Sequence, residues 1–223
     1  MRPPGSRNAP RISFWGPSMD QRLRVFIDFW NFQLNWNDRT GKAPPDWPKV
    51  PLALAQKARD LMATAGSTDT LVLHETRVYA SYDPASPKDA KLRAWLDAFL
   101  DRQPSFRVFT RERKSHPRPV RCPACGGEFL NCPQCNQAFR QSAEKGVDTA
   151  IATDLLSLAW EGAYDVAILV SSDADFVPAV ERLQEKGFKV INATWRGHGH
   201  QLARVCWASF EIDGLTTGLV RET

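Results

Sequence analysis

Residues 166–176 read VAILVSSDADF, and they constrain the fold more than any other stretch of this 223-residue chain. A short apolar run ends there in two serines and an Asp-x-Asp pair. Such a run predicts a strand that is buried on both faces, as strands of parallel sheets are. Open α/β sheets bind their ligands at the carboxyl ends of their strands. The stretch therefore predicts that Asp173 and Asp175 lie at the ligand-binding edge of a parallel sheet.

Two other segments place acidic residues at the end of an element. Residues 23–28 (LRVFID) predict a second buried strand, which ends on Asp28 and is followed three residues later by Asn31. Asp148 lies at the start of a run with helical periodicity, residues 147–162. Carboxylates from separate elements suggest one divalent-cation site, and their oxygens suit Mg²⁺ or Mn²⁺. Such ions commonly act on phosphate esters.

Each of these carboxylates also has a simpler interpretation. Asp28 could serve only as a helix cap or turn residue, and Asp148 only as a charge that favours a helix N-terminus. Asp173 and Asp175 could cap the helix that follows them. Asp154 lies six residues after Asp148, which turns it away from that residue on a helix, so we expect it to be structural.

The rest of the chain alternates between strand and helix patterns. We expect strands at 70–82, 106–112 and 188–195, a short edge strand at 209–213, and helices at 52–65, 87–103 and 175–187. Residues 35–51 are polar and rich in proline, which predicts a loop. The alternation predicts an α/β domain over residues 21–215, with a parallel sheet flanked by helices. Residues 1–20 are basic, contain four prolines and lack an apolar core, which predicts a disordered leader and no secretory signal.

Four of the five cysteines form two pairs of equal spacing, Cys122–Cys125 and Cys132–Cys135. Two such turns can supply the four thiolates of a tetrahedral Zn²⁺ site. Two disulfides are the alternative, but nothing in the sequence indicates an oxidising compartment, so we expect structural zinc and a cytoplasmic protein. The pairs predict a compact zinc ribbon or knuckle over residues 118–140, inserted into the domain. Cys206 stands apart, and we expect it to pack as a small apolar side chain.

Positive charge is concentrated just before the first cysteine pair. Residues 111–121 carry one acidic residue and five basic ones, Arg111, Arg113, Lys114, Arg118 and Arg121. Such a run favours binding to a phosphate backbone. The alternative is a solvated loop that only aids solubility. No apolar run reaches the roughly 20 residues of a membrane-spanning helix, so no membrane partner is expected.

Three motifs, taken in order, resemble the NYN domain family, which includes LabA-like proteins and belongs to the PIN-like nuclease superfamily. They are Asp28-x-x-Asn31, KGVDTAIATDLL at 145–156, and SSDADFVPAVERLQEKGFKVI at 171–191. The resemblance covers about residues 23–195 and is interrupted by the cysteine module, which is not part of the family's basic pattern. It implies a PIN-like fold with strand order 3-2-1-4-5 and metal-dependent cleavage of RNA.

The resemblance also assigns roles to residues of this chain. Asp28, Asp148 and Asp173 match the metal-binding carboxylates of the family. Asp175 matches a fourth acidic position, and Asn31 matches a polar residue that helps to hold the metal-bound water or the substrate phosphate. The leading prediction is therefore a metal-dependent ribonuclease whose zinc module and basic run grip the RNA.

Two other functions fit the same residues. One is a non-catalytic RNA-binding protein in which the zinc module performs the recognition. The other is an adaptor whose zinc ribbon binds a protein partner or a second copy of the chain. The complete set of acidic residues favours the ribonuclease, and the arginines beside the cysteines favour RNA over a protein partner.

Overall fold

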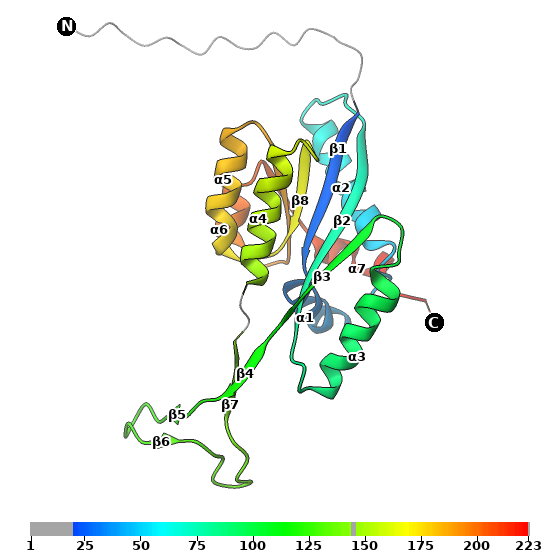
Figure 1. Cartoon of the computed structure of the whole chain (residues 1–223). Helices are drawn as coiled ribbons and strands as arrows, with labels where there is room; N and C mark the ends of the chain where they lie inside the picture. Colours follow the sequence, from blue (N-terminus) through cyan, green and yellow to red (C-terminus); the bar gives the residue numbers. More distant parts are fainter. Residues whose placement is uncertain (1–19, 144–145, 223) are drawn as a thin grey trace, which may run out of the picture.

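The protein is described here by a computed structural model that covers residues 20–143 and 146–222 (Figure 1). The expected leader at residues 1–20 lies outside the described residues, apart from Asp20. Lys145, within one of the motifs above, lies outside them as well.

Six parallel strands form the central sheet of the described chain. Their spatial order is β3 (Phe106–Glu112), β2 (Leu71–Tyr82), β1 (Gln21–Asp28), β8 (Val166–Val170), β9 (Lys189–Thr194) and β10 (Ala208–Glu211). The expected order 3-2-1-4-5 is confirmed, and the strand predicted at 209–213 adds a sixth parallel member. Every residue of β8 is buried, as the apolar run predicted.

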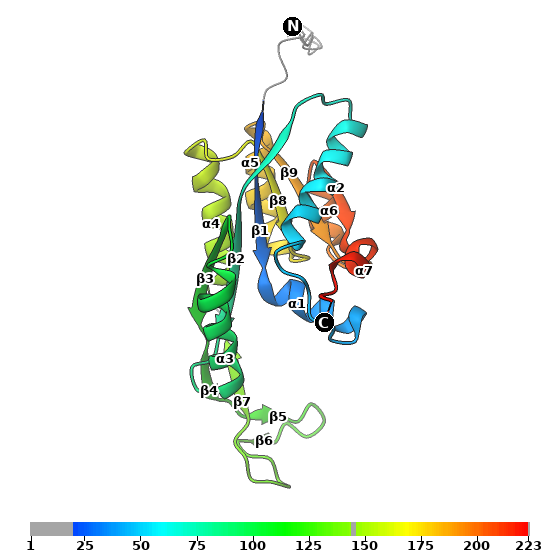
Figure 2. The ribbon, with the colours of Figure 1, turned by 90° about the vertical axis from the view of Figure 1, so that its right-hand side faces the viewer.

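Helices cover both faces of the sheet, so that the body has three layers (Figure 2). One face carries α1 (Phe29–Thr40), α2 (Val50–Thr64), α3 (Pro87–Trp95) with a π-helical turn (Leu96–Leu100), a 3₁₀ turn (Ile212–Leu215) and α7 (Thr216–Leu219). The other carries α4 (Val147–Trp160), a 3₁₀ turn (Ala174–Phe176), α5 (Val177–Glu185) and α6 (His200–Val205). Alternate residues of β1 pack into the two cores on opposite faces of the sheet: Val25 and Ile27 face one core, and Phe26 faces the other.

Helix α1 corrects the loop expected at residues 35–51. It continues to Thr40 and ends at Gly41, whose φ of 62° is the left-handed value that favours glycine at a helix end. The polar sequence NWNDRT (residues 35–40) did not indicate a helix, because only some of its side chains face the core and the others face solvent. Phe32 and Trp36 are fully buried and stack on each other at 5.7 Å between ring centroids.

An arm leaves the body where β3 ends (Figure 1). It consists of the antiparallel pair β4 (Lys114–Pro117) and β7 (Arg140–Ala143), and the shorter pair β5 (Val120–Arg121) and β6 (Glu128–Phe129). The chain then returns to the body at the start of α4. Since β3 ends and α4 begins at the carboxyl edge of the sheet, both connections of the arm lie beside the expected site.

Candidate active site

Asp28 connects the end of the central strand to the start of α1. It is the last residue of β1 and is only 9% exposed. Its Oδ1 accepts a hydrogen bond from the Asn31 N–H at 3.2 Å and so caps α1. Its Oδ2 accepts a hydrogen bond from the Ser171 hydroxyl at 3.3 Å. The capping role is therefore present, together with a link to the turn that follows β8.

That turn after β8 fixes the Asp-x-Asp pair. The Asp173 N–H donates to Ser171 Oγ at 3.2 Å, and the Asp175 N–H donates to Asp173 Oδ1 at 2.9 Å. Asn192, fully buried in β9, donates from its amide to the carbonyls of Leu169 and Ser171. The turn is therefore held from two neighbouring strands, since Asp28 on β1 and Asn192 on β9 both bind Ser171.

Three carboxylates converge at this edge of the sheet. Asp148, Asp173 and Asp175 each offer one carboxylate oxygen, and these oxygens lie within 4.8 Å of one another. Asp148 comes from the first turn of α4, just after Gly146, whose φ is 89°. Asp28 is joined to this group through Ser171. Of the three predicted metal ligands, Asp148 and Asp173 belong to this closest group, together with Asp175, whereas Asp28 does not.

The charge of the group is concentrated. Within residues 20–143 and 146–222, neither Asp173 nor Asp175 forms an ion pair. Clustered carboxylates repel one another, and a bound cation relieves that repulsion. Oxygen donors of this kind match the preferences of Mg²⁺ and Mn²⁺, so the donor set fits such an ion.

Asp154 has the structural role that its helical position predicted. Its carboxylate accepts hydrogen bonds from Arg77 at 2.6 Å and from the Tyr79 hydroxyl at 2.7 Å. Burial, together with the hydrogen bond to Asp154, raises the pKa of Tyr79. These contacts tie α4 to β2 and fix the helix that carries Asp148.

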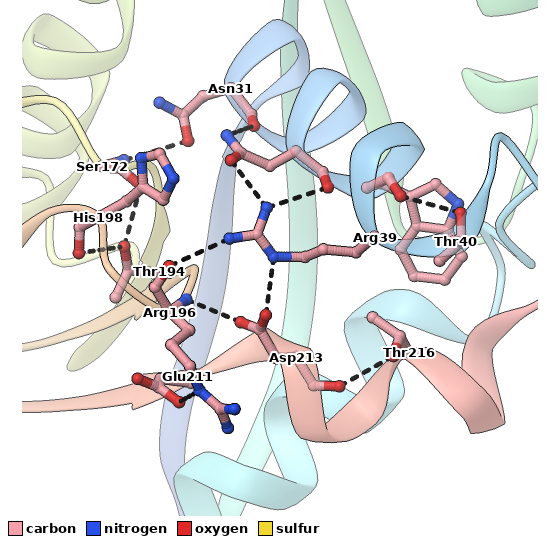
Figure 3. Close-up of polar contacts among 12 residues, drawn as sticks. Asn31, Arg39, Thr40, Ser172, Thr194, Arg196, His198, Glu211, Asp213 and Thr216 are labelled. Atoms are coloured by element: carbon pink, nitrogen blue, oxygen red, sulfur yellow. Dashed lines mark hydrogen bonds and ion pairs between the residues drawn. The ribbon is translucent and has the colours of Figure 1, made fainter.

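Asn31 connects the site to the loops after β8 and β9 (Figure 3). Its Oδ1 accepts a hydrogen bond from the Ser172 N–H at 3.2 Å. The Ser172 and Thr194 hydroxyls lie 2.9 Å apart, and Thr194 donates to the carbonyl of His198 at 3.3 Å. The Asn31 side chain therefore orients the turn that carries Asp173.

The loop after β9 packs tightly against the same turn. Gly199 has a φ of 66°, and a Cβ there would lie 2.6 Å from Thr194 Oγ1 and 3.1 Å from Ser172 Cα. Arg39 of α1 secures the loop from its other side, because it binds Asp213 at 2.7 Å and the carbonyl of Arg196 at 3.1 Å (Figure 3). The glycine is therefore required by close approach, as well as by its backbone conformation.

The five basic residues of segment 111–121, which were predicted to bind RNA, lie in different environments. Arg111 is exposed at the end of β3, and Arg118 and Arg121 are exposed on the arm. Arg113 forms an ion pair with Asp89, and its guanidinium lies 4.9 Å from the centre of the Trp30 ring. The structure describes only the backbone of Lys114, in β4.

The two cysteine pairs form turns of the same design. The Cys122 and Cys132 N–H groups each donate at 2.8 Å to the carbonyl five residues ahead, and each cysteine's carbonyl accepts from the N–H four residues ahead. The residue after each second cysteine has positive φ, 73° at Gly126 and 56° at Asn136. Backbone N–H groups lower the pKa of Cys122 (from Cys125 and Ala124) and of Cys132 (from Cys135 and Gln134).

All the cysteines are free thiols. The turn geometry and the hydrogen bonds directed at sulfur stabilise thiolates, which are the form that binds zinc. Cys206 differs from the other four, since burial raises its pKa to about 12. It packs against the core beneath α4, α5 and α6, as its apolar surroundings in the sequence predicted.

The strand order of the sheet and the acidic residues at its carboxyl edge fit the family that the whole sequence matches. A sequence model of the NYN domain matches residues 22–212. The chain belongs to the NYN family. NYN domains are PIN-like nuclease domains, so the resemblance seen in the three motifs is confirmed.

A solved structure shares the fold of this NYN domain. It is a protein of unknown function from Vibrio parahaemolyticus, with 18% sequence identity and a TM-score of 0.52. The alignment covers 89% of this chain and 96% of the Vibrio chain. No curated protein matches the sequence. In the described part of the NYN protein, no helix is long and apolar enough to cross a membrane.

Two supporting residues of the NYN site escaped the sequence analysis. Asn192 lies within an apolar strand, where a polar side chain is a signal for a buried hydrogen bond. Arg39 lies in the helix that was taken for a loop, and its partner Asp213 is 174 positions away. Only the first of these could have been suspected from the local pattern.

Proposed function

We propose that this NYN domain is a metal-dependent ribonuclease that hydrolyses RNA phosphodiester bonds at its acidic edge. The observation that carries the proposal is the convergence of Asp148, Asp173 and Asp175, whose carboxylate oxygens lie within 4.8 Å of one another. They occur at the carboxyl edge of a parallel sheet, where such folds bind ligands. Membership of a PIN-like nuclease family supports the same reaction.

The three carboxylates would hold Mg²⁺ or Mn²⁺, with Asp28 supporting them through Ser171. A bound divalent ion supplies charge stabilisation to the phosphate and lowers the pKa of a bound water. The residues of the chain position this site. Asn31 orients the turn at Ser172, and Ser171 fixes the backbone of Asp173.

RNA needs a basic surface beside this acidic group, because carboxylates repel a polyanion. A groove of about 730 Å³ lies between β3 and α4, and Arg111, Thr149 and Gly146 contribute to its lining. It lies beside Asp148 and near the root of the arm. We assign Arg111, Lys114, Arg118 and Arg121 to contacts with the phosphate backbone. Arg113 fixes the root of the arm through Asp89.

The arm would require structural Zn²⁺ to present these residues. Cys122, Cys125, Cys132 and Cys135 supply the four thiolates. Matching backbone geometry in the two turns supports a site built from both, because two equivalent turns can approach one tetrahedral ion from opposite sides. The zinc would then set the position of Arg121, which directly precedes the first turn.

The activity is tested by incubating the purified protein with structured and unstructured RNA, with Mn²⁺, with Mg²⁺ or with neither. We expect cleavage only with a divalent ion, and its loss in Asp173→Asn. The Asn variant should still bind RNA at low salt, since it removes a negative charge beside the phosphates. Asp38→Asn is the matched control, because Asp38 is exposed on α1 outside the acidic group and should leave cleavage unchanged.

Equal cleavage by the wild type and Asp173→Asn would assign the activity to another site or to a contaminant. Binding of RNA without cleavage under every metal condition would favour a non-catalytic RNA-binding protein.

One observation favours a protein-binding role for the arm. Val120, Phe129 and Leu130 are 50%, 47% and 60% exposed, although they are apolar. Exposed apolar side chains gathered on a small module are typical of a protein interface. Light scattering of the wild type and of a Phe129→Ser, Leu130→Ser variant would test for self-association. A monomer in both cases would argue against a second copy as the partner.

A further inference from the structure

A second cavity lies on the opposite side of α1 from the acidic edge. It has a volume of about 690 Å³ and is bounded by α1, by the chain between α1 and α2, and by α3 with its π-helical turn. That volume is within the range of about 300–1,000 Å³ that is typical of small-molecule sites. None of the residues assigned to the acidic site lines it.

Aromatic rings supply most of its apolar lining. Phe29 and Trp47 form a buried base, with ring centroids 5.7 Å apart in a stacked arrangement. Trp95, which is partly buried, stacks on Phe99 at 5.8 Å, and Trp30 adds a second partly buried indole. Flat aromatic faces of this kind bind nucleobases by stacking, with little dependence on sequence.

The rim of the cavity is positively charged. Lys42, Lys88 and Arg221 line it and are exposed, and none of them forms an ion pair among the described residues. Both acidic residues of the lining are neutralised. Asp46 pairs with Lys49 at 2.8 Å, and Asp89 pairs with Arg113. An aromatic cavity with a cationic rim matches a ligand with a flat apolar ring and an anionic group.

Helix α1 places this cavity close to the acidic edge. Phe29 and Gln33 are separated by one helical turn and share a face, which lines the cavity. Asn31 lies between them in sequence, about 200° around the helix, and its side chain binds the turn that carries Asp173. A single RNA strand that crosses the start of α1 could therefore reach both.

We propose that this cavity binds an unpaired nucleotide of the RNA, with the base against the aromatic rings and the phosphate at Lys42, Lys88 and Arg221. The identity of the natural ligand rests on the proposed ribonuclease function, but nucleotide binding does not. The rim disfavours the chain's own proline-containing residues 1–19, which carry three arginines and no acidic residue. Like charges would repel that segment.

The test uses the whole chain as purified, without added Mg²⁺ or Mn²⁺, and titrates AMP, UMP, adenosine and ribose 5-phosphate by calorimetry. We expect AMP and UMP to bind more tightly than adenosine or ribose 5-phosphate. Trp95→Ala should weaken AMP binding about 5- to 150-fold, which corresponds to the loss of about 1–3 kcal/mol of stacking. Trp160→Ala is the matched control, since Trp160 is 55% exposed on α4, on the other face of the sheet.

A double variant at two exposed lysines tests the proposal without altering the core of the protein. Lys42→Ser with Lys88→Ser should weaken AMP binding but leave adenosine binding unchanged, and Lys57→Ser on α2 is the control. Failure of AMP to bind, or equal binding by the wild type and both cavity variants, would overturn the proposal. Displacement of AMP from the cavity by a synthetic peptide of residues 1–19 at equal concentration would also overturn it, in favour of the leader.

The outcome is separable from that of the ribonuclease proposal. If Asp173→Asn and the wild type bind AMP equally and neither cleaves RNA, the cavity stands without the nuclease. If RNA is cleaved and AMP binding is absent, the nuclease stands without the cavity.

Discussion

The body and the arm of this protein are built by different forces. The body buries apolar side chains on both faces of a six-stranded sheet, including all of β8. In the arm, no side chain of residues 117–139 is buried, and two cysteine turns replace a core. Hydrophobic burial explains the first region and cannot explain the second, for which we propose a structural metal.

The body and the arm also differ in the sign of their exposed charge. The body places carboxylates at the sheet edge, whereas the arm and its root carry exposed arginines. The joint between them is a fixed contact. Arg113 pairs with Asp89 and donates from its backbone to the Tyr82 carbonyl at 2.6 Å. The comparison therefore predicts that each region can be disturbed without the other.

Removal of zinc should have the largest effect, and it should be confined to the arm. Structural zinc in small modules contributes about 10–16 kcal/mol of apparent binding energy, and the arm has no buried core to replace it. We expect Cys122→Ser to make residues 118–139 sensitive to limited proteolysis while the melting of the body is unchanged. Cys206→Ala is the control, with zinc content measured in each protein. A wild type without zinc, or with a mass that shows two disulfides, would contradict the division.

Truncation of a core ring should have the next largest effect, confined to the body. Phe32 is fully buried and contacts the rings of Trp36, Trp47 and Trp195. Phe32→Ala should lower the free energy of unfolding by about 3–5 kcal/mol, because it leaves a cavity among these rings. Denaturant titration measures the change. Loss of zinc from the folded variant would show that the two regions are coupled.

The joint should respond to pH. Burial opposes ionisation of Asp89, but the Asp83 N–H and the Arg113 guanidinium outweigh it and lower the pKa of Asp89 in the folded state. A lowered folded pKa gives stability that is present above the unfolded pKa of about 3.9 and is lost as the pH falls through the folded value. Asp89→Asn should therefore cost about 1–3 kcal/mol at pH 7, and the difference from wild type should shrink below about pH 4. A difference that is constant from pH 7 to pH 3 would reject the ionised pair.

Exposed arginines on each side of the joint should affect RNA binding and leave stability almost unchanged. Arg111 is the penultimate residue of β3 in the body, and Arg121 lies in the arm. Each phosphate contact contributes about 0.7 to the slope of log affinity against log salt for a single strand, so the double Ser variant should reduce the slope by about 1.4. Arg182→Ser on α5 is the control. An unchanged slope would remove these two residues from the RNA interface.

Short-range patterns made much of this protein predictable. The strand at 106–112 and the run at 166–170 have the predicted bounds or lie within them, because period and apolar content are set by neighbouring residues. The cysteine turns close within six residues, so their spacing alone indicates their geometry. The motifs around Asp28, Asp148 and Asp173 were sufficient to identify the family.

Only the tertiary structure decided how these parts meet. The end of α1 depends on burial of Trp36, which stacks on Phe32, and Phe32 in turn contacts the distant Trp195; this burial outweighs the polar sequence around Trp36. The link from Asp28 to Ser171 spans 143 positions, and that from Arg39 to Asp213 spans 174. The aromatic cavity combines residues from positions 29 to 221. Sequence determines the elements because their signals are local, whereas the site depends on packing, which brings together residues that share no local pattern.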